Sequence, residues 1–258
     1  MSFPKLEVAT PDLETNKSKP YSETLRIVVV IPTSKRPASF EQMLRHLAQN
    51  EFPSNLDHII VVENGPQLGV EKILLRYPHL PLMYLHEPKA NKSLALNRAL
   101  DALDGNPLIV FFDDDVVVHS TCVQAYQDAA LQLPERAYLG GPTTAIYEKA
   151  PPTWLVNYFF PSEKGLLYEG PLGWTRPNLF FIGFNWACYK DLLIEAGGFD
   201  PRFGPGSPSV ASGQESQMQR CLQSIHVQGY YVPEATVSHH VTSKTGSPSW
   251  ILFRLFKS

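Results

Sequence analysis

The chain has 258 residues, of which 43% are hydrophobic and 18% are charged, and its formal net charge is −3. A chain of this length and composition can bury the core of one large globular domain or of two small ones. The slightly negative charge argues against a general electrostatic binder of nucleic acid, because such proteins carry an excess of lysine and arginine.

Short apolar runs alternate with helical patterns through the first half of the chain. After a predicted flexible arm at residues 1–24, runs that suit buried strands lie at 27–31, 59–62, 82–85 and 108–112. Between them, apolar residues at helical spacing predict helices at 40–48, 70–76 and 93–103, the first of them capped by Ser39. This alternation with short links predicts an α/β fold with a mostly parallel sheet flanked by helices.

The second half is less regular. Apolar spacing predicts helices at 123–133, 191–196 and 214–225, and a strand is predicted at 179–184. Residues 140–177 form a stretch rich in aromatic residues and proline, for which no regular structure is predicted.

Three consecutive aspartates, Asp113, Asp114 and Asp115, directly follow the predicted strand at 108–112. In an open parallel sheet, ligands bind beyond the carboxyl ends of the strands. Carboxylates this close together raise one another's pKa or require a cation. A hard divalent ion such as Mg²⁺ or Mn²⁺ takes oxygen ligands and keeps positions open for phosphate. The place of the aspartates in the sheet favours a metal site over a solvated acidic turn.

Seven short motifs, in the same order along the chain, resemble those of the family 2 glycosyltransferases. They are IPTSKR at 31–36, VVENG at 61–65, FDDD at 112–115, GFN at 183–185, GGFD at 197–200, GQE at 213–215 and PEATVSH at 233–239. The resemblance covers about residues 25–242 and implies the GT-A fold, with a Rossmann-like sheet and a mixed C-terminal half. It implies a nucleotide-sugar-binding half at 25–120 and an acceptor-binding, catalytic half of the same domain at 121–245.

The resemblance also implies a reaction and the residues that perform it. An inverting enzyme of this family moves a sugar from a nucleotide-diphosphate donor, UDP-linked by preference, to a hydroxyl of a carbohydrate or glycoconjugate acceptor. Glu215 stands at the position of the catalytic base. Asp115, Asp113 and His239 would bind Mn²⁺ or Mg²⁺, and the adjacent His240 faces the other way if both lie on a strand. The implied donor-binding residues are Pro32, Thr33, Arg36, Glu63, Lys92, Asp113 and Asp114.

The acceptor side is predicted from motif position and aromatic content. Asn185 and Gln214 belong to the GFN and GQE motifs, whereas Trp174 and Trp186 lie in or beside the aromatic-rich region. Tryptophan rings stack on sugar faces, but they are equally ordinary material for a core. All four are candidates for the acceptor-binding set.

Three departures from the family pattern bear on function. Glu63 stands in place of an aspartate, Gln214 in place of the first acid of a pair, and Leu96 in place of an arginine, for which Lys92 is a possible substitute. The Gln214 and Leu96 departures keep open a catalytically inactive nucleotide-sugar-binding protein. A nucleotidyltransferase is a second alternative, because such enzymes also combine a parallel sheet with acidic metal ligands.

The ends of the chain and its cysteines bear on localisation. No apolar run approaches the roughly 20 residues that span a bilayer, and the N-terminus lacks the apolar stretch of a secretory signal. The three cysteines show no CxxC pairing and indicate buried thiols in a reducing compartment. The segment at 246–258 is amphipathic and fits a truncated helix, a homodimer contact or a membrane-surface segment. We therefore expect a cytoplasmic enzyme, with peripheral contact at the inner face of the membrane as one option.

Overall fold

Strands and helices alternate through the first half of the chain, as the hydrophobic pattern predicts. The computed structural model describes residues 25–207 and 213–255, so the predicted arm at 1–24 lies outside the described residues. The elements of this half are β1 (Ile27–Thr33), α1 (Pro37–Leu47), β2 (Leu56–Asn64), α2 (Val70–Leu74), β3 (Leu82–Glu87), α3 (Lys92–Asp101) and β4 (Leu108–Phe111).

The second half has shorter strands separated by longer connections. The three helices predicted there are confirmed as α4, α7 and α8, whereas the strands β5 to β10 and the short helices α5 and α6 were not predicted. The elements are β5 (Val116–Val118), α4 (Cys122–Gln132), β6 (Ala137–Gly140), β7 (Thr143–Tyr147), α5 (Thr153–Val156), α6 (Pro161–Lys164), β8 (Trp186–Tyr189), α7 (Lys190–Glu195), α8 (Gln214–Ser224), β9 (Gln228–Tyr231), β10 (Val237–Val241) and α9 (Pro248–Leu255).

The strand predicted at 179–184 is wrong, because this segment is a buried loop and the strand begins at Trp186. Phe181 is buried, and its backbone hydrogen bonds are made with a side chain and not with a neighbouring strand. The amide of Gln219 on α8 accepts from the Phe181 N–H at 2.8 Å and donates to the Phe181 carbonyl at 3.1 Å. A buried backbone needs partners and not necessarily a sheet, so an apolar run alone does not identify a strand.

The predicted cap of α1 by Ser39 is also wrong. The helix begins at Pro37, and Arg36 is its N-cap residue, without a side-chain capping bond. Proline is favoured at the first helical position because its φ is already helical and no N–H is lost there. Ser39 instead donates to the backbone carbonyl of Asp114 at 3.1 Å.

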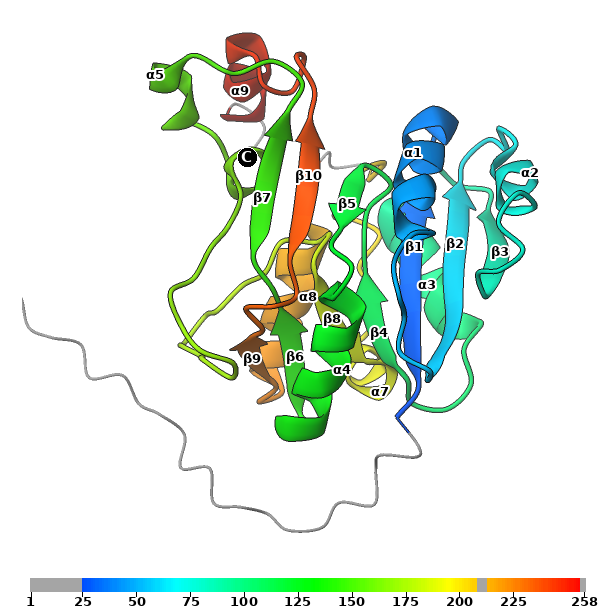
Figure 1. The fold of residues 1–258 in the computed structure, drawn as a ribbon. Helices are drawn as coiled ribbons and strands as arrows, with labels where there is room; N and C mark the ends of the chain where they lie inside the picture. Colours follow the sequence, from blue (N-terminus) through cyan, green and yellow to red (C-terminus); the bar gives the residue numbers. More distant parts are fainter. Residues whose placement is uncertain (1–24, 208–212, 256–258) are drawn as a thin grey trace, which may run out of the picture.

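One seven-stranded sheet runs through both halves of the chain, in the order β3-β2-β1-β4-β8-β6-β9 (Figure 1). The pairs β1 with β2, β2 with β3 and β1 with β4 are parallel, and so is β6 with β9. Only β8 is antiparallel to its neighbours β4 and β6. The mostly parallel sheet predicted from the alternating pattern is therefore confirmed.

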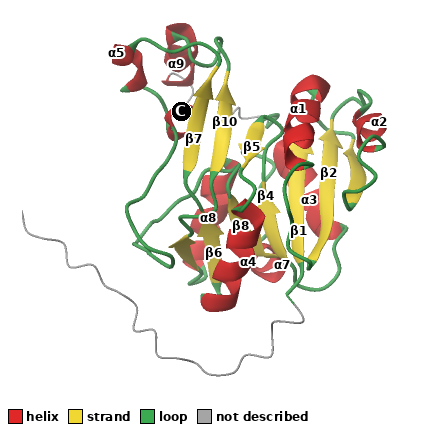
Figure 2. Ribbon diagram, in the orientation of Figure 1, coloured by secondary structure: helices red, strands yellow, loops and turns green. Residues whose placement is uncertain are grey.

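Helices cover both faces of this sheet (Figure 2). Ile27, Val29 and Ile31 of β1 pack with α1, α2 and α4 on one face. Val28 and Val30 pack with α3, α7 and α8 on the other. Because side chains alternate along a strand, a run that is apolar at every position belongs in a strand buried on both faces.

A second, three-stranded sheet in the order β5-β10-β7 stands beside the large one. Strand β10 is antiparallel to β5 and parallel to β7. Helices α5 and α9 lie beyond the far ends of β7 and β10, where Leu155, Phe159 and Ile251 form a small separate core (Figure 1). Among the helices of residues 25–207 and 213–255, none has the length and apolar character needed to cross a membrane.

Candidate functional site

The aspartates at 113–115 lie in the turn between β4 and β5, and each carboxylate is paired with a cation from another element. Lys92, the first residue of α3, donates to the Asp113 carboxylate. Arg36 contacts the next two, with 2.5 Å from its guanidinium to each of the Asp114 and Asp115 carboxylates. The loop after β1, the start of α3 and the turn after β4 therefore meet at one place.

Local structure holds these two cations in position. Asn91 caps α3 by accepting from the Leu94 N–H at 3.0 Å, and its amide donates to the Pro201 carbonyl at 2.9 Å. Lys92 is therefore fixed in the first turn of α3. Arg36 directly precedes Pro37, and its side chain remains half exposed while it binds two carboxylates.

The pKa values in this cluster follow burial and pairing. Burial alone would lower the pKa of Lys92, but the charges of Asp113 and Glu215 raise it above its usual range. For Asp115, burial acts to raise the pKa, but the hydrogen bond with His239 and the charge of Arg36 hold it well below the usual range. The structure therefore favours an ionised carboxylate at Asp115, which is the form that binds cations.

Asp114 differs from its neighbours because its side chain is fully buried. Thr33 donates to the Asp114 carboxylate at 2.6 Å. Burial, only partly offset by Arg36, raises the pKa of Asp114 to about 6. Pro32 and Thr33 at the end of β1 are buried as well. These three predicted donor residues thus shape the loop that carries Arg36, and they present no side-chain surface to a donor.

His239 on β10 faces the same cluster. Its Nε2 lies 3.6 Å from Asp115 Oδ1, and its ring stacks on Phe184 with 4.9 Å between centroids. Its Nδ1 lies 2.8 Å from the backbone carbonyl of Ser162, which can only accept, so Nδ1 carries a proton. Burial would lower the pKa of His239, but the interaction with Asp115 raises it. The protonated ring therefore donates from Nε2 to the Asp115 carboxylate, whereas in a neutral ring held by the Ser162 carbonyl the lone pair is on Nε2.

Glu215 lies in the first turn of α8, where an acidic residue is favoured by the helix dipole. Its carboxyl group packs over Gly183, where an added Cβ would be 2.9 Å from Glu215 Cδ. Burial raises the pKa of Glu215, and the charge of Lys92 partly offsets this. The electrostatic interaction with Lys92 and Asp113 places Glu215 at the same site as the aspartates.

Glu63 at the end of β2 has both carboxylate oxygens engaged within its own half of the fold. It accepts from the Leu68 N–H at 2.6 Å and from the Tyr84 hydroxyl at 2.7 Å, and it is 1% exposed. The extra methylene relative to aspartate is used to reach the loop that leads to α2. Glu63 therefore fixes this loop, and a donor base would have to displace these bonds to reach it.

The four residues predicted for the acceptor side do not lie together. Trp186 is 1% exposed and stacks on Phe111 inside the core, with 4.8 Å between ring centroids. Asn185 is fully buried and donates to the Pro142 and Ala235 carbonyls at 2.9 and 2.7 Å. As groups inside the core, Trp186 and Asn185 offer no surface to an acceptor.

The other two candidates have different surroundings. Gln214 begins α8 beside Glu215 but is 4% exposed, and its side chain packs against Gly204. Trp174 is half-buried beside β9, the edge strand of the sheet, where its ring packs on Tyr168. Trp174 alone among the four has an accessible ring.

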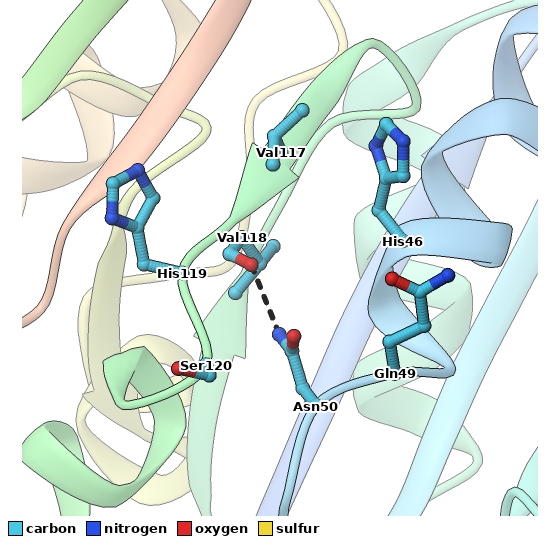
Figure 3. A pocket seen from close by; sticks show the side chains of 7 residues that line it. All are labelled: His46, Gln49, Asn50, Val117, Val118, His119 and Ser120. Atoms are coloured by element: carbon cyan, nitrogen blue, oxygen red, sulfur yellow. Dashed lines mark hydrogen bonds between the residues drawn. The ribbon is translucent and has the colours of Figure 1, made fainter.

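A hollow of about 380 Å³ lies between β5 and the C-terminal end of α1 (Figure 3). It is lined by His46 near the end of α1, by Gln49 and Asn50 just after that helix, and by Val117 to Ser120. Asn50 closes part of it by donating to the Val118 carbonyl at 2.9 Å. No carboxylate lines this hollow, so it is separate from the site formed by the aspartates, His239 and Glu215.

Ser162 and Phe184 are neighbours of His239 that sequence reasoning did not assign to the site. Phe184 lies in the GFN motif, which was a signal for its place, whereas Ser162 acts through its backbone carbonyl and leaves no sequence signal. Within residues 25–207 and 213–255, no three His, Cys, Asp or Glu side chains are grouped so that they could hold a metal ion. Asp115 and His239 converge as a pair.

An open, mostly parallel sheet with acidic and basic side chains beyond β1 and β4 is the architecture of the GT-A glycosyltransferases. The sequence profile of glycosyl transferase family 2 matches residues 28–197. The chain therefore belongs to this family and is a glycosyltransferase, which favours sugar transfer over nucleotidyl transfer.

Individual relatives agree with this assignment. The chain is 26% identical over 245 residues to the succinoglycan biosynthesis protein ExoM of Rhizobium meliloti (strain 1021), covering 92% of this chain and 74% of that protein. It is similar in fold to the mannosyltransferase PcManGT from Pyrobaculum calidifontis in complex with GDP-Man and Mn²⁺, with a TM-score of 0.56, 20% identity, and coverage of 83% of this chain and 56% of that one.

A second solved structure shows the same fold. The similarity to S. aureus TarS 1–349 in complex with UDP-GlcNAc has a TM-score of 0.61 at 12% identity, covering 85% of this chain and 59% of that one. The chain thus spans little more than half the length of PcManGT and of this TarS fragment. At these identities the solved structures support the fold alone.

Proposed function

We propose that the chain transfers a sugar from a nucleotide-diphosphate donor to an acceptor hydroxyl in one displacement that inverts the anomeric configuration. The proposal is supported by the pair of Asp115 and His239, 3.6 Å apart, and by the electrostatic interaction of Glu215 with Lys92 and Asp113. The acceptor is a carbohydrate or glycoconjugate. UDP-sugars are the preferred donors in this proposal. The preference for uridine over guanosine is weak, because the Glu63 carboxylate, which would contact the base, already accepts hydrogen bonds from Leu68 and Tyr84.

Glu215 acts as the general base in this proposal. The acceptor oxygen forms a bond to the anomeric carbon, its proton passes to the Glu215 carboxylate, and the bond from the anomeric carbon to the phosphate oxygen breaks. The bonding electrons leave with the nucleoside diphosphate. Because burial raises the pKa of Glu215, its carboxylate, when ionised, is a stronger base than an exposed one.

The chemistry of these side chains suits a divalent ion, with Asp115 and His239 as the pair that lies close together and no third such side chain grouped with them among the described residues. Asp115 and Asp113 provide carboxylate oxygens, and His239 presents Nε2 because its Nδ1 donates to the Ser162 carbonyl. A second ring nitrogen held by a backbone carbonyl is the usual arrangement of a metal-binding histidine. Bound there, Mn²⁺ or Mg²⁺ would neutralise negative charge on the diphosphate as it leaves. Arg36 and Lys92, which pair with the aspartates, are available to the phosphate oxygens.

A thermal-shift screen of UDP- and GDP-sugars, each with and without MnCl2, tests donor binding. A ligand at 100 times its Kd stabilises the folded state by about 2.7 kcal/mol, which corresponds to about 5–10 °C for a chain of this size. We expect one nucleotide sugar to give such a shift only with MnCl2. If no nucleotide sugar shifts the melting temperature, donor binding is refuted.

Glu215→Gln tests the base. The variant should bind the donor found in the screen with unchanged affinity and should lose transfer. Wild-type transfer by this variant would show that another group accepts the proton.

A further inference from the structure

Helix α9 reaches back to the site through one side chain, Arg254. The helix lies beyond the far ends of β7 and β10, next to α5 (Figure 1). It is held there by Ile251, which is 2% exposed and packs with Leu155 and Phe159. From this anchor, Arg254 extends toward α6.

Arg254 contacts three residues in and beside α6. Its guanidinium donates to the Ser162 hydroxyl at 2.8 Å and to the Glu163 carboxylate. It also lies over the Phe160 ring, 4.2 Å from the centroid. Glu163 is 3% exposed, and its second oxygen accepts from the Ser162 hydroxyl at 3.0 Å. The Ser162 hydroxyl therefore forms hydrogen bonds with both Arg254 and Glu163.

Helix α6 needs such support. It has four residues, and a single helical turn does not persist without tertiary contacts. An acid as buried as Glu163 requires a cationic partner, and Arg254 is that partner. The α6 backbone in turn provides the Ser162 carbonyl that accepts from His239 Nδ1 at 2.8 Å.

We propose that Arg254 is a positioning residue for the glycosyltransferase site, holding α6 so that the Ser162 carbonyl fixes His239 with Nε2 toward Asp115. This inference deepens the proposed function and rests on it for its catalytic consequence. It makes α9 part of the functional site although α9 lies outside the residues that match the family profile, 28–197. Arg254 acts on nucleotide binding through His239 and need not touch the donor. Its charge also lowers the pKa of Glu215, so the tests below measure the His239 tautomer and UDP affinity and not transfer.

The first test is the tautomer of His239, observed by nitrogen-15 NMR of the histidine side chains in the whole chain at alkaline pH. In the wild type we expect a single form with the proton on Nδ1. In Arg254→Met, which keeps an unbranched side chain but removes the guanidinium that lies over Phe160, the preference for the Nδ1 proton should be lost. An unchanged His239 spectrum in this variant would overturn the proposal.

Two further variants keep the NMR test decisive. Arg254→Met leaves Glu163 buried without its cation, so the double variant with Glu163→Gln removes that penalty if the single variant folds poorly. The double variant still leaves Ser162 without the Arg254 guanidinium, so the preference of His239 for the Nδ1 proton should again be lost. The control is Arg136→Met, because Arg136 pairs at the surface with Glu195 at 2.9 Å and should leave His239 unchanged.

The second test is a double-mutant cycle on UDP affinity, titrated by calorimetry with MnCl2. Partners of metal-binding residues typically contribute 10–100-fold to affinity, and we expect a loss in this range for Arg254→Met. If Arg254 acts through His239, adding Arg254→Met to His239→Ala should cause no further loss. Additive losses would mean a direct diphosphate contact or a general loss of structure, and either would overturn the proposal.

The two tests separate this inference from the proposed function. If His239→Ala leaves UDP affinity unchanged, the proposed metal site is wrong, and the NMR spectrum alone decides whether Arg254 positions His239. If His239→Ala weakens binding but Arg254→Met does not, the site stands and the inference on Arg254 is wrong.

Discussion

Gly183 gives the Glu215 carboxyl group its place, so Gly183→Ala should displace the base without touching the donor. An added Cβ would lie 2.9 Å from Glu215 Cδ and 3.0 Å from Cγ. Carbon atoms in contact prefer about 3.5–4.0 Å, so the Glu215 side chain must retreat by about 0.6–1 Å. Gly183 is not among the glycines with positive φ, so alanine fits the backbone and the effect is confined to this contact.

The expected loss follows from that displacement. A misplacement of about 1 Å at a reacting group costs about 100-fold in rate, or about 2.7 kcal/mol in the activation free energy. The assay measures release of nucleoside diphosphate from the donor under steady-state conditions. We expect kcat to fall about 100-fold while donor affinity and melting temperature stay close to the wild type.

Gly246→Ala is the matched control, because its added Cβ would approach no atom closer than 3.4 Å. This variant should retain wild-type kcat. Gly183→Ala with unchanged kcat would refute the placement of Glu215 as the base. A fall in donor affinity as large as the fall in kcat would show that the substitution disturbs the donor site instead.

Three other substitutions test separate parts of the account. Thr33→Val removes the hydroxyl that donates to the buried Asp114, and chemical denaturation should show a loss of about 1–3 kcal/mol in the free energy of unfolding; no loss would mean that this bond is not formed. Lys92→Met removes a charge that lowers the pKa of Glu215, so the acid side of the kcat/KM profile should move to higher pH. A profile that stays in place or moves to lower pH would contradict the electrostatic interaction between Lys92 and Glu215. Trp186→Ala should cost about 3–5 kcal/mol of stability as a core truncation, whereas an acceptor-stacking residue would lose acceptor affinity at unchanged stability.

The first half of the fold was predictable from sequence because strands buried on both faces contain apolar residues at nearly every position. Residues 27–31 and 59–62 have this pattern, and helices with one apolar face separate them. The strands β6, β7 and β9 carry a weaker signal, since each has at most five residues and includes glycine, threonine or glutamine. They are fixed by pairing with strands far along the chain, which local pattern does not reveal.

The polar site was predictable in outline because its residues follow strand ends or begin helices. Asp115 and His239 lie 3.6 Å apart in the folded chain, and Glu215 interacts electrostatically with Lys92 and Asp113. Sequence did not separate Asp114 from its neighbours, since burial of the middle carboxylate depends on Thr33 and Arg36 from another loop. It also gave no sign of Arg254, whose role depends on a contact over 91 residues with Glu163.

The central claim is that Asp115 holds the metal-dependent nucleotide site. Calorimetric titration of UDP, or GDP if the screen selects it, into the wild type and Asp115→Asn with and without MnCl2 tests it most directly. Asp57→Asn is the control, because Asp57 pairs with Arg26 at the opposite end of β2. We predict that MnCl2 strengthens binding to the wild type and to Asp57→Asn and has no effect on Asp115→Asn. Equal, manganese-dependent affinity in Asp115→Asn would contradict it.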